Sequence, residues 1–108
     1  MKVGIIGSGG REHAICENIK NSSKIKKIFC FPGNAGTSKI AENVNINSDN
    51  FEILKNFIVE KKIDLIFVGP EKPLVEGLVD YFFCQLLGLY IYTIQFQNRN
   101  YLKFYLFL

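Results

Sequence analysis

Three glycines within four residues, followed by an arginine, make up the stretch of this sequence best suited to binding a ligand. The run Gly7–Arg11 follows a short apolar segment, Val3–Ile6, and a helix is expected to begin near Gly10. Glycine lets the backbone turn tightly and lets a ligand approach its N–H groups. The first N–H groups of a helix and the positive end of its dipole attract anions. The spacing therefore predicts a phosphate-binding loop, and a purely structural turn is the alternative reading of the same residues.

The loop departs from the dinucleotide fingerprint, which is Gly-x-Gly-x-x-Gly with an acidic residue about 20 positions further on. Gly7 and Gly9 match, but Glu12 stands at the third glycine position, and the second predicted strand ends at Phe31 rather than at an acid. We therefore expect a smaller phosphorylated ligand instead of a nicotinamide or flavin dinucleotide. Glu12 is expected to complement the helix N-terminus. His13 is expected to be a packed or capping residue rather than a catalytic one.

Two further glycine- and proline-rich turns follow apolar segments, at Pro32–Thr37 and at Gly69–Leu74. The carboxyl ends of neighbouring parallel strands meet at one edge of a sheet, which is where open α/β sheets bind ligands. We therefore expect these two turns and the loop Gly7–Arg11 to line a single crevice.

Strand and helix patterns alternate along the chain, which predicts an α/β fold with a parallel sheet and helices on both of its faces. Asp49 is expected to cap the second helix, with Glu52 reaching back to the backbone. The first helix is expected to turn four side chains inward: Ala14, Ile15, Cys16 and Ile19. Strands are predicted at about 3–6, 27–31 and 63–68, a short extended segment at 44–46, and helices at about 11–21, 38–42, 51–62 and 73–82.

Composition excludes several classes of protein. With 108 residues, 48% of them hydrophobic and 21% charged, the chain is typical of one globular domain. The net charge of +3 comes from scattered lysines rather than a basic face, so we expect no nucleic-acid partner. Three cysteines without C-x-x-C spacing argue against a disulfide framework and a zinc site. No apolar signal segment precedes the first strand, so a cytoplasmic protein is expected.

The three turns also carry a family resemblance. Gly-Ser-Gly-Gly-Arg-Glu-His at 7–13, Pro-Gly-Asn-Ala-Gly-Thr at 32–37 and Gly-Pro-Glu-Lys-Pro-Leu at 69–74 resemble the N-terminal domain of the phosphoribosylamine–glycine ligase family, also called glycinamide ribonucleotide synthetases. The resemblance covers about 1–82 and implies a Rossmann-like domain that precedes ATP-grasp domains. It also implies the joining of glycine to 5-phosphoribosylamine in purine biosynthesis, through a glycyl phosphate formed with ATP and Mg²⁺ or Mn²⁺.

The resemblance implies that the turns of this chain hold the phosphoribosyl substrate, with no catalytic residue, metal ligand or cofactor expected within the chain itself. Arg11 is expected to pair with the substrate phosphate, next to the N–H groups of the loop. The expected substrate-binding residues are Gly7, Ser8, Gly9, Gly10, Arg11, Asn34, Gly36, Thr37, Gly69, Pro70, Glu71, Pro73 and Leu74.

The composition changes after Phe82, and we divide the chain into a Rossmann-like domain, 1–82, and a divergent apolar tail, 83–108. The tail has no Asp or Glu and holds eight of the fifteen aromatic residues. An out-of-frame reading of AT-rich DNA would produce such a tail. The apolar run at 81–96 is shorter than the roughly 20 residues of a membrane-spanning helix. We expect a fourth strand within 86–94 instead, and self-association through the tail.

Three functions remain open from the sequence alone. The first is an N-terminal part of the ligase, expected to be inactive alone because the ATP-grasp domains lie outside this chain. The second is a stand-alone module that binds a ribose phosphate or nucleotide without catalysis. The third is a non-functional fragment that aggregates through its apolar tail.

Overall fold

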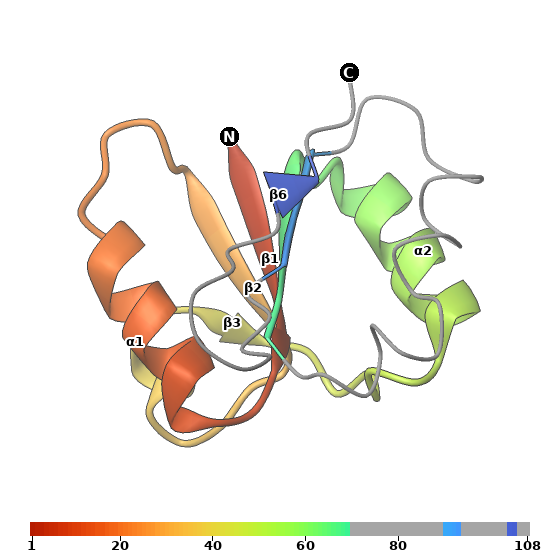
Figure 1. Cartoon of the computed structure of the whole chain (residues 1–108), viewed down its shortest axis with the longest axis horizontal. Coiled ribbons are helices and arrows are strands. Elements are labelled where there is room, and N and C mark those ends of the chain that lie inside the picture. Colours follow the sequence, from red (N-terminus) through yellow and green to blue (C-terminus); the bar gives the residue numbers. More distant parts are fainter. Residues whose placement is uncertain (70–89, 94–103, 106–108) are drawn as a thin grey trace.

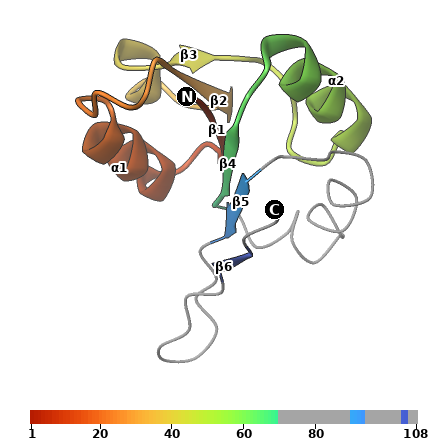
Figure 2. The same ribbon diagram turned by 90° about the horizontal axis from the view of Figure 1, so that it is seen from above.

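In the residues that the structure describes, a six-stranded sheet carries α1 on one face and α2 on the other (Figures 1 and 2). The computed structural model describes residues 1–69, 90–93 and 104–105. The elements are β1 (Lys2–Gly7), α1 (Gly10–Ile19), β2 (Lys27–Pro32), the 3₁₀ turn η1 (Thr37–Lys39), β3 (Glu42–Asn43), α2 (Phe51–Lys61), β4 (Leu65–Val68), β5 (Tyr90–Thr93) and β6 (Phe104–Tyr105).

The strand order is β3-β2-β1-β4-β5-β6, with β1 near the centre of the sheet. The pairs that join β3 through β5 are parallel, and β6 runs antiparallel to β5. The α/β prediction with helices on both faces is therefore confirmed. The expected fourth strand is present over Tyr90–Thr93, next to β4.

Alternation along the strands divides the core between the two faces of the sheet. From β1, Val3 and Ile5 join Cys16 of α1 in one buried cluster. Ile6, the next residue of β1, faces the opposite cluster, which contains Leu54 of α2. Successive side chains of a strand point to opposite faces, and both faces of a parallel sheet are covered. The central residues of β1 and β2 and all of β4 are therefore apolar, as the sequence predicted.

Aromatic contacts lock α2 against its face of the sheet. The ring of Phe57 meets Phe29 and Phe31 edge-on, with centroids 5.4 Å apart in each pair. Gly4 of β1 lies under this cluster. A Cβ added at Gly4 would lie 2.6 Å from Cδ1 of Ile66, so the close packing on this face requires a residue without a side chain.

Three local predictions differ from the structure. The cap of α2 is Asn50, whose side chain accepts from Ile53 N, and not Asp49. Ala14, expected on the inner face of α1, is exposed, whereas Cys16 is fully buried. The extended segment expected at Val44 begins earlier, as β3. The differences at α2 and β3 are shifts of one or two residues, because sequence patterns locate an element better than its ends. The difference at Ala14 concerns which side of α1 faces the sheet, where Glu12 and Cys16 are the buried residues.

Two predictions concern residues that the structure does not describe. The helix expected at 73–82 and the domain boundary between 1–82 and 83–108 lie outside the described ranges, and both stay predictions. Within the described ranges, no helix combines the length and the apolar character needed to cross a membrane.

Candidate functional site

The ends of three parallel strands meet at one edge of the sheet. In the register of β1 with β2, Gly7 lies opposite Pro32, and in that of β1 with β4, Ile6 lies opposite Val68. Gly33 N donates to the carbonyl of Gly7 at 3.1 Å, and Gly69 N donates to that of Ile6 at the same distance. The loop after β1, the turn after β2 and the first residue after β4 therefore leave the sheet side by side, as predicted.

The glycine loop after β1 is shaped by a buried carboxylate. Glu12 is only 5% exposed and accepts a hydrogen bond from Gly9 N at 2.6 Å. Gly7 has φ +136°, a conformation that suits glycine, and a Cβ there would lie 2.7 Å from Cγ and Cδ of Glu12. A Cβ added at Gly9 or Gly69 would also meet the Glu12 side chain.

The role of Glu12 is larger than the sequence predicted. A residue expected only to complement the helix N-terminus instead fills the space between the glycine loop and the exit of β4. Its spacing from Gly9 is that of the second member of a capping box, whose side chain reaches back to the N-cap backbone. That spacing is visible in the sequence, but the contact with the distant Gly69 is not.

The turn after β2 is held by side chains that bond to the backbone. Asn34 and Thr37 are joined by two reciprocal bonds: Asn34 N donates to Thr37 Oγ1 at 2.8 Å, and Thr37 N donates to Asn34 Oδ1 at 2.9 Å. Asn43 of β3 donates from Nδ2 to the carbonyl of Asn34 at 2.7 Å and accepts from Thr37 Oγ1. Asn43 is not among the residues predicted from the sequence.

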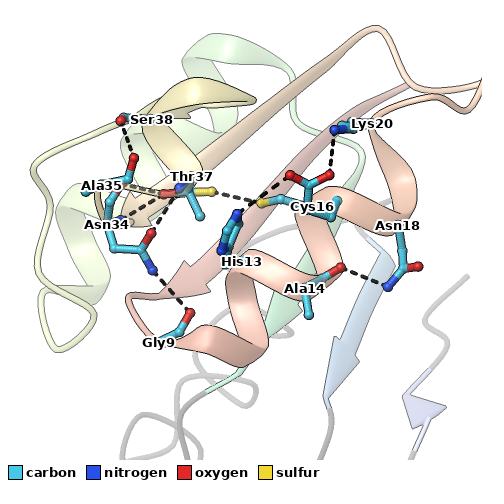
Figure 3. A network of polar contacts seen from close by, with 12 residues as sticks. Gly9, His13, Ala14, Cys16, Asn18, Lys20, Asn34, Ala35, Thr37 and Ser38 are labelled. Atoms are coloured by element: carbon cyan, nitrogen blue, oxygen red, sulfur yellow. Dashed lines mark hydrogen bonds and ion pairs between the residues drawn. The ribbon is translucent and has the colours of Figure 1, made fainter.

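Asn34 also connects the second turn to the first. Its Nδ2 donates to the carbonyl of Ser8 at 2.9 Å. The same Nδ2 donates to the carbonyl of Gly9 at 3.2 Å (Figure 3). Arg11 makes the matching link to the third strand end, because its Nη1 donates to the carbonyl of Gly69 at 3.1 Å. Two residues predicted to bind substrate thus also brace the three turns against one another.

The predicted site residues differ in exposure. Ser8, Gly9, Gly10 and Arg11 are exposed. Asn34 and Gly36 are partly buried, and the buried members are Gly7, Thr37 and Gly69. Pro70, Glu71, Pro73 and Leu74 lie outside the described residues.

Thr37 and His13 have structural contacts at this site. Thr37 is fully buried, and its hydroxyl lies within the hydrogen-bond network of the turn. The His13 ring packs on Gly36, where an added Cβ would lie 2.7 Å from its Cε1, and Nε2 lies 3.7 Å from Glu17 Oε1. The His13 side chain thus lies against Gly36 and remains 40% exposed.

Glu17 of α1 forms an ion pair with Lys20. Lys20 Nζ lies 2.5 Å from Glu17 Oε2 and, by this hydrogen bond, lowers the pKa of the Glu17 carboxyl.

In the part of the chain that the structure describes, no three His, Cys, Asp or Glu side chains gather in a way that could hold a metal ion. The arrangement offers backbone N–H groups and one guanidinium at the crevice, which suits recognition of an anion.

Comparisons with known proteins agree with this geometry. The family model described as "Phosphoribosylglycinamide synthetase, N domain" matches residues 1–94. The chain is 54% identical over 82 residues to the phosphoribosylamine–glycine ligase of Caldanaerobacter subterraneus subsp. tengcongensis, and 45% identical over 82 residues to that of Clostridium acetobutylicum. The corresponding ligase of Pseudomonas putida is 52% identical over 84 residues.

The match covers most of this chain and a small part of each relative. Each alignment spans 76% of the chain, but only 20%, 20% and 19% of the three ligases in turn. The chain thus corresponds to about a fifth of the length of the curated relatives that it matches. With the family model extending over residues 1–94 and the strand ends joined as described, the chain belongs to the phosphoribosylglycinamide synthetase N-domain family.

Proposed function

We propose that this chain forms the N-terminal, substrate-holding part of a ligase that joins phosphoribosylamine to glycine in purine biosynthesis. The observation that carries the proposal is the junction of three strand ends by Asn34 and Arg11, in a chain 54% identical to a relative of that name. A crevice braced in this way presents backbone donors in fixed positions, which is how a protein recognises a phosphate without a large conformational cost.

The proposed ligand is the phosphoribosyl end of the substrate. The exposed part of the loop, Ser8–Arg11, supplies the donors at the start of α1, and Arg11 adds a guanidinium of the kind that pairs with phosphate. Glu12 stands where a dinucleotide fingerprint has its third glycine, and its side chain fills the space beside Gly7 and Gly69. This supports a small phosphorylated sugar over a dinucleotide.

The proposed reaction requires parts that this chain does not contain. We propose that ATP, glycine and Mg²⁺ or Mn²⁺ are bound by ATP-grasp domains of the longer ligase. The 108 residues alone are accordingly expected to be inactive, and the ligase is proposed to act in the cytoplasm.

A chimera tests the proposal. Residues 1–82 of this chain would replace the matched 82 residues of the Caldanaerobacter ligase, and ATP hydrolysis that depends on both glycine and phosphoribosylamine would be measured. We expect the chimera to be active, and neither the 108-residue chain nor the remaining relative domains to be active alone. A folded chimera that still binds glycine and ATP but forms no product would contradict the proposal.

A second candidate is a stand-alone module that binds ribose phosphate without catalysis. It is favoured by the fact that the bonds joining the three strand ends, among the residues that the structure describes, lie within residues 6–69. Calorimetric titration of the 108-residue chain with ribose 5-phosphate and with NAD distinguishes a site for a small phosphorylated sugar from a site for a dinucleotide. We expect binding of ribose 5-phosphate only, and preferential binding of NAD would overturn the small-ligand assignment.

A further inference from the structure

One peptide group of the glycine loop is held from both sides. The carbonyl oxygen of the Ser8–Gly9 peptide accepts from Asn34 Nδ2 at 2.9 Å, and its N–H, on Gly9, donates to Glu12 Oε2 at 2.6 Å. In a planar trans peptide the carbonyl and the N–H point in opposite directions. A side chain from the β2 turn and another from α1 therefore fix the plane of the same peptide.

The next peptide is held on its carbonyl side. The carbonyl of Gly9 accepts from Asn34 Nδ2 at 3.2 Å and from His13 N at 3.2 Å. The N–H of Gly10 points away from that carbonyl, because the two belong to one planar group. A Cβ added at Gly10 would meet nothing within 4 Å, whereas one at Gly9 would meet Glu12. The open side of the loop is thus at Gly10.

The two side chains that hold the loop are themselves held. Asn34 Oδ1 accepts from Thr37 N at 2.9 Å, which leaves the Nδ2 end of the amide facing the loop. Thr37 is fully buried, so this anchor is set in the protein interior. Glu12 is 5% exposed and lies between the loop and Gly69. Neither side chain can turn away without breaking contacts beyond the loop.

We propose that Glu12 and Asn34 are paired positioning residues, which hold the Ser8–Gly9 peptide so that the Gly10 side of the loop meets the phosphate of a phosphoribosyl ligand. This inference rests on the proposed function. Glu12 does not touch the ligand in this scheme, because its carboxylate would repel phosphate, and it acts through the Gly9 N–H. Donors that are already oriented bind an anion without a further ordering cost.

Variants of Glu12 distinguish its role as the hydrogen-bond acceptor for Gly9 N from the effect of its negative charge. Glu12→Gln and Glu12→Ala both remove the negative charge, but only glutamine keeps an oxygen that can accept from Gly9 N. The full 108-residue chain would be titrated with ribose 5-phosphate, with amide resonances followed by NMR and the melting temperature recorded for each variant. We expect Glu12→Gln to bind like the parent and Glu12→Ala to bind about tenfold more weakly, the effect of one lost hydrogen bond.

Variants of Asn34 separate donation from added charge. Asn34→Asp keeps an acceptor for Thr37 N but removes the donor to Ser8 and Gly9. Ala35→Asp is the matched control, because it adds the same charge to an exposed position of the same turn. Relative to that control, Asn34→Asp is expected to bind about tenfold more weakly. The double variant Glu12→Ala/Asn34→Asp should bind ribose 5-phosphate no more than about twofold more weakly than whichever single variant has the lower affinity. The reason is that loss of either contact already lets the Ser8–Gly9 peptide rotate.

The outcomes distinguish this inference from the proposed function. Faster hydrogen exchange of the Gly9 amide in Glu12→Ala, together with the affinity pattern above in folded variants, supports both. The positioning role is overturned, and the binding site stands, if the parent binds ribose 5-phosphate but Glu12→Ala binds like Glu12→Gln and Asn34→Asp binds like Ala35→Asp. The same conclusion follows if the losses of affinity in the two single variants simply add in the double variant. If the folded parent binds no ribose 5-phosphate, the proposed function fails, and the positioning role fails with it.

Discussion

Arg11 donates from Nη1 to the carbonyl oxygen of Gly69 at 3.1 Å, and this bond ties the first turn of α1 to the residue that follows β4. The two residues are 58 positions apart in the sequence. The bond places the guanidinium at the exit of β4, next to Gly69.

Replacing Arg11 by alanine is expected to weaken binding of ribose 5-phosphate about tenfold to a hundredfold, because charged hydrogen bonds contribute roughly 1.5–3 kcal/mol. Arg11→Lys should recover part of the affinity, since the positive charge remains while the planar fork is lost. Calorimetric titration with parallel thermal melts makes the measurement. A large fall in melting temperature with unchanged affinity per folded molecule would assign Arg11 a structural role alone.

Gly4 is expected to tolerate no side chain while Ile66 is present. Gly4→Ala would place a Cβ 2.6 Å from Ile66 Cδ1 and 3.0 Å from Phe31 Cε2, so we expect a loss of about 1–3 kcal/mol in the free energy of unfolding, as for other overpacked cores. Urea denaturation measures this loss. Ile66→Val removes the clashing Cδ1 methyl, and the double variant should lose less stability than the two single losses added together. Simple additivity would show that the clash is relieved elsewhere.

The N-terminus of α2 is expected to depend on Asn50. Its side chain accepts from Ile53 N, so Asn50→Ala should lower the free energy of unfolding by about 1 kcal/mol, the usual effect of losing a helix cap. Asp49→Ala is the matched control and should change stability by less than about 0.5 kcal/mol. Chemical denaturation of both variants makes the comparison. A larger loss for Asp49→Ala would restore the cap that the sequence predicted.

The thiols of Cys16 and Cys30, which lie 3.4 Å apart between α1 and β2, are expected to make stability fall at alkaline pH. The hydrogen bond with Cys16, followed by burial, raises the pKa of Cys30. Above the ordinary thiol pKa of about 8.5 the unfolded chain loses this proton while the folded protein keeps it, so the free energy of unfolding decreases as pH rises.

Denaturation measured from about pH 8 to about pH 10 tests this, with a slope of up to roughly 1.4 kcal/mol per pH unit from one thiol. The double variant Cys16→Ala/Cys30→Ala should have a flatter profile, because it lacks both thiols of the pair while the rest of the chain is unchanged. Identical slopes in the parent and the double variant would exclude a contribution from the pair.

The order of the elements was predictable from residues near one another in the chain. Apolar runs such as Ile63–Val68, which contains β4, marked buried strands, and the period of Leu54 and Ile58 marked α2. Burial on both faces of a parallel sheet leaves a continuous apolar run, which is a strong local signal. The glycine-rich turns after the strands followed from the same reasoning, and so did their meeting at one edge.

Contacts between distant residues were decided only by the tertiary structure. Glu12, 5% exposed, excludes a side chain at Gly69, and Asn34 holds the carbonyls of Ser8 and Gly9. Residue types and spacing identify which groups can bond, but not which of several partners the packed backbone brings within reach. The sequence by itself determined that the glycine-rich ends of β1, β2 and β4 meet at one edge of the sheet. The packing of α1 and the β2 turn against the sheet decided which N–H groups of the loop are already paired, as the Gly9 N–H is with Glu12.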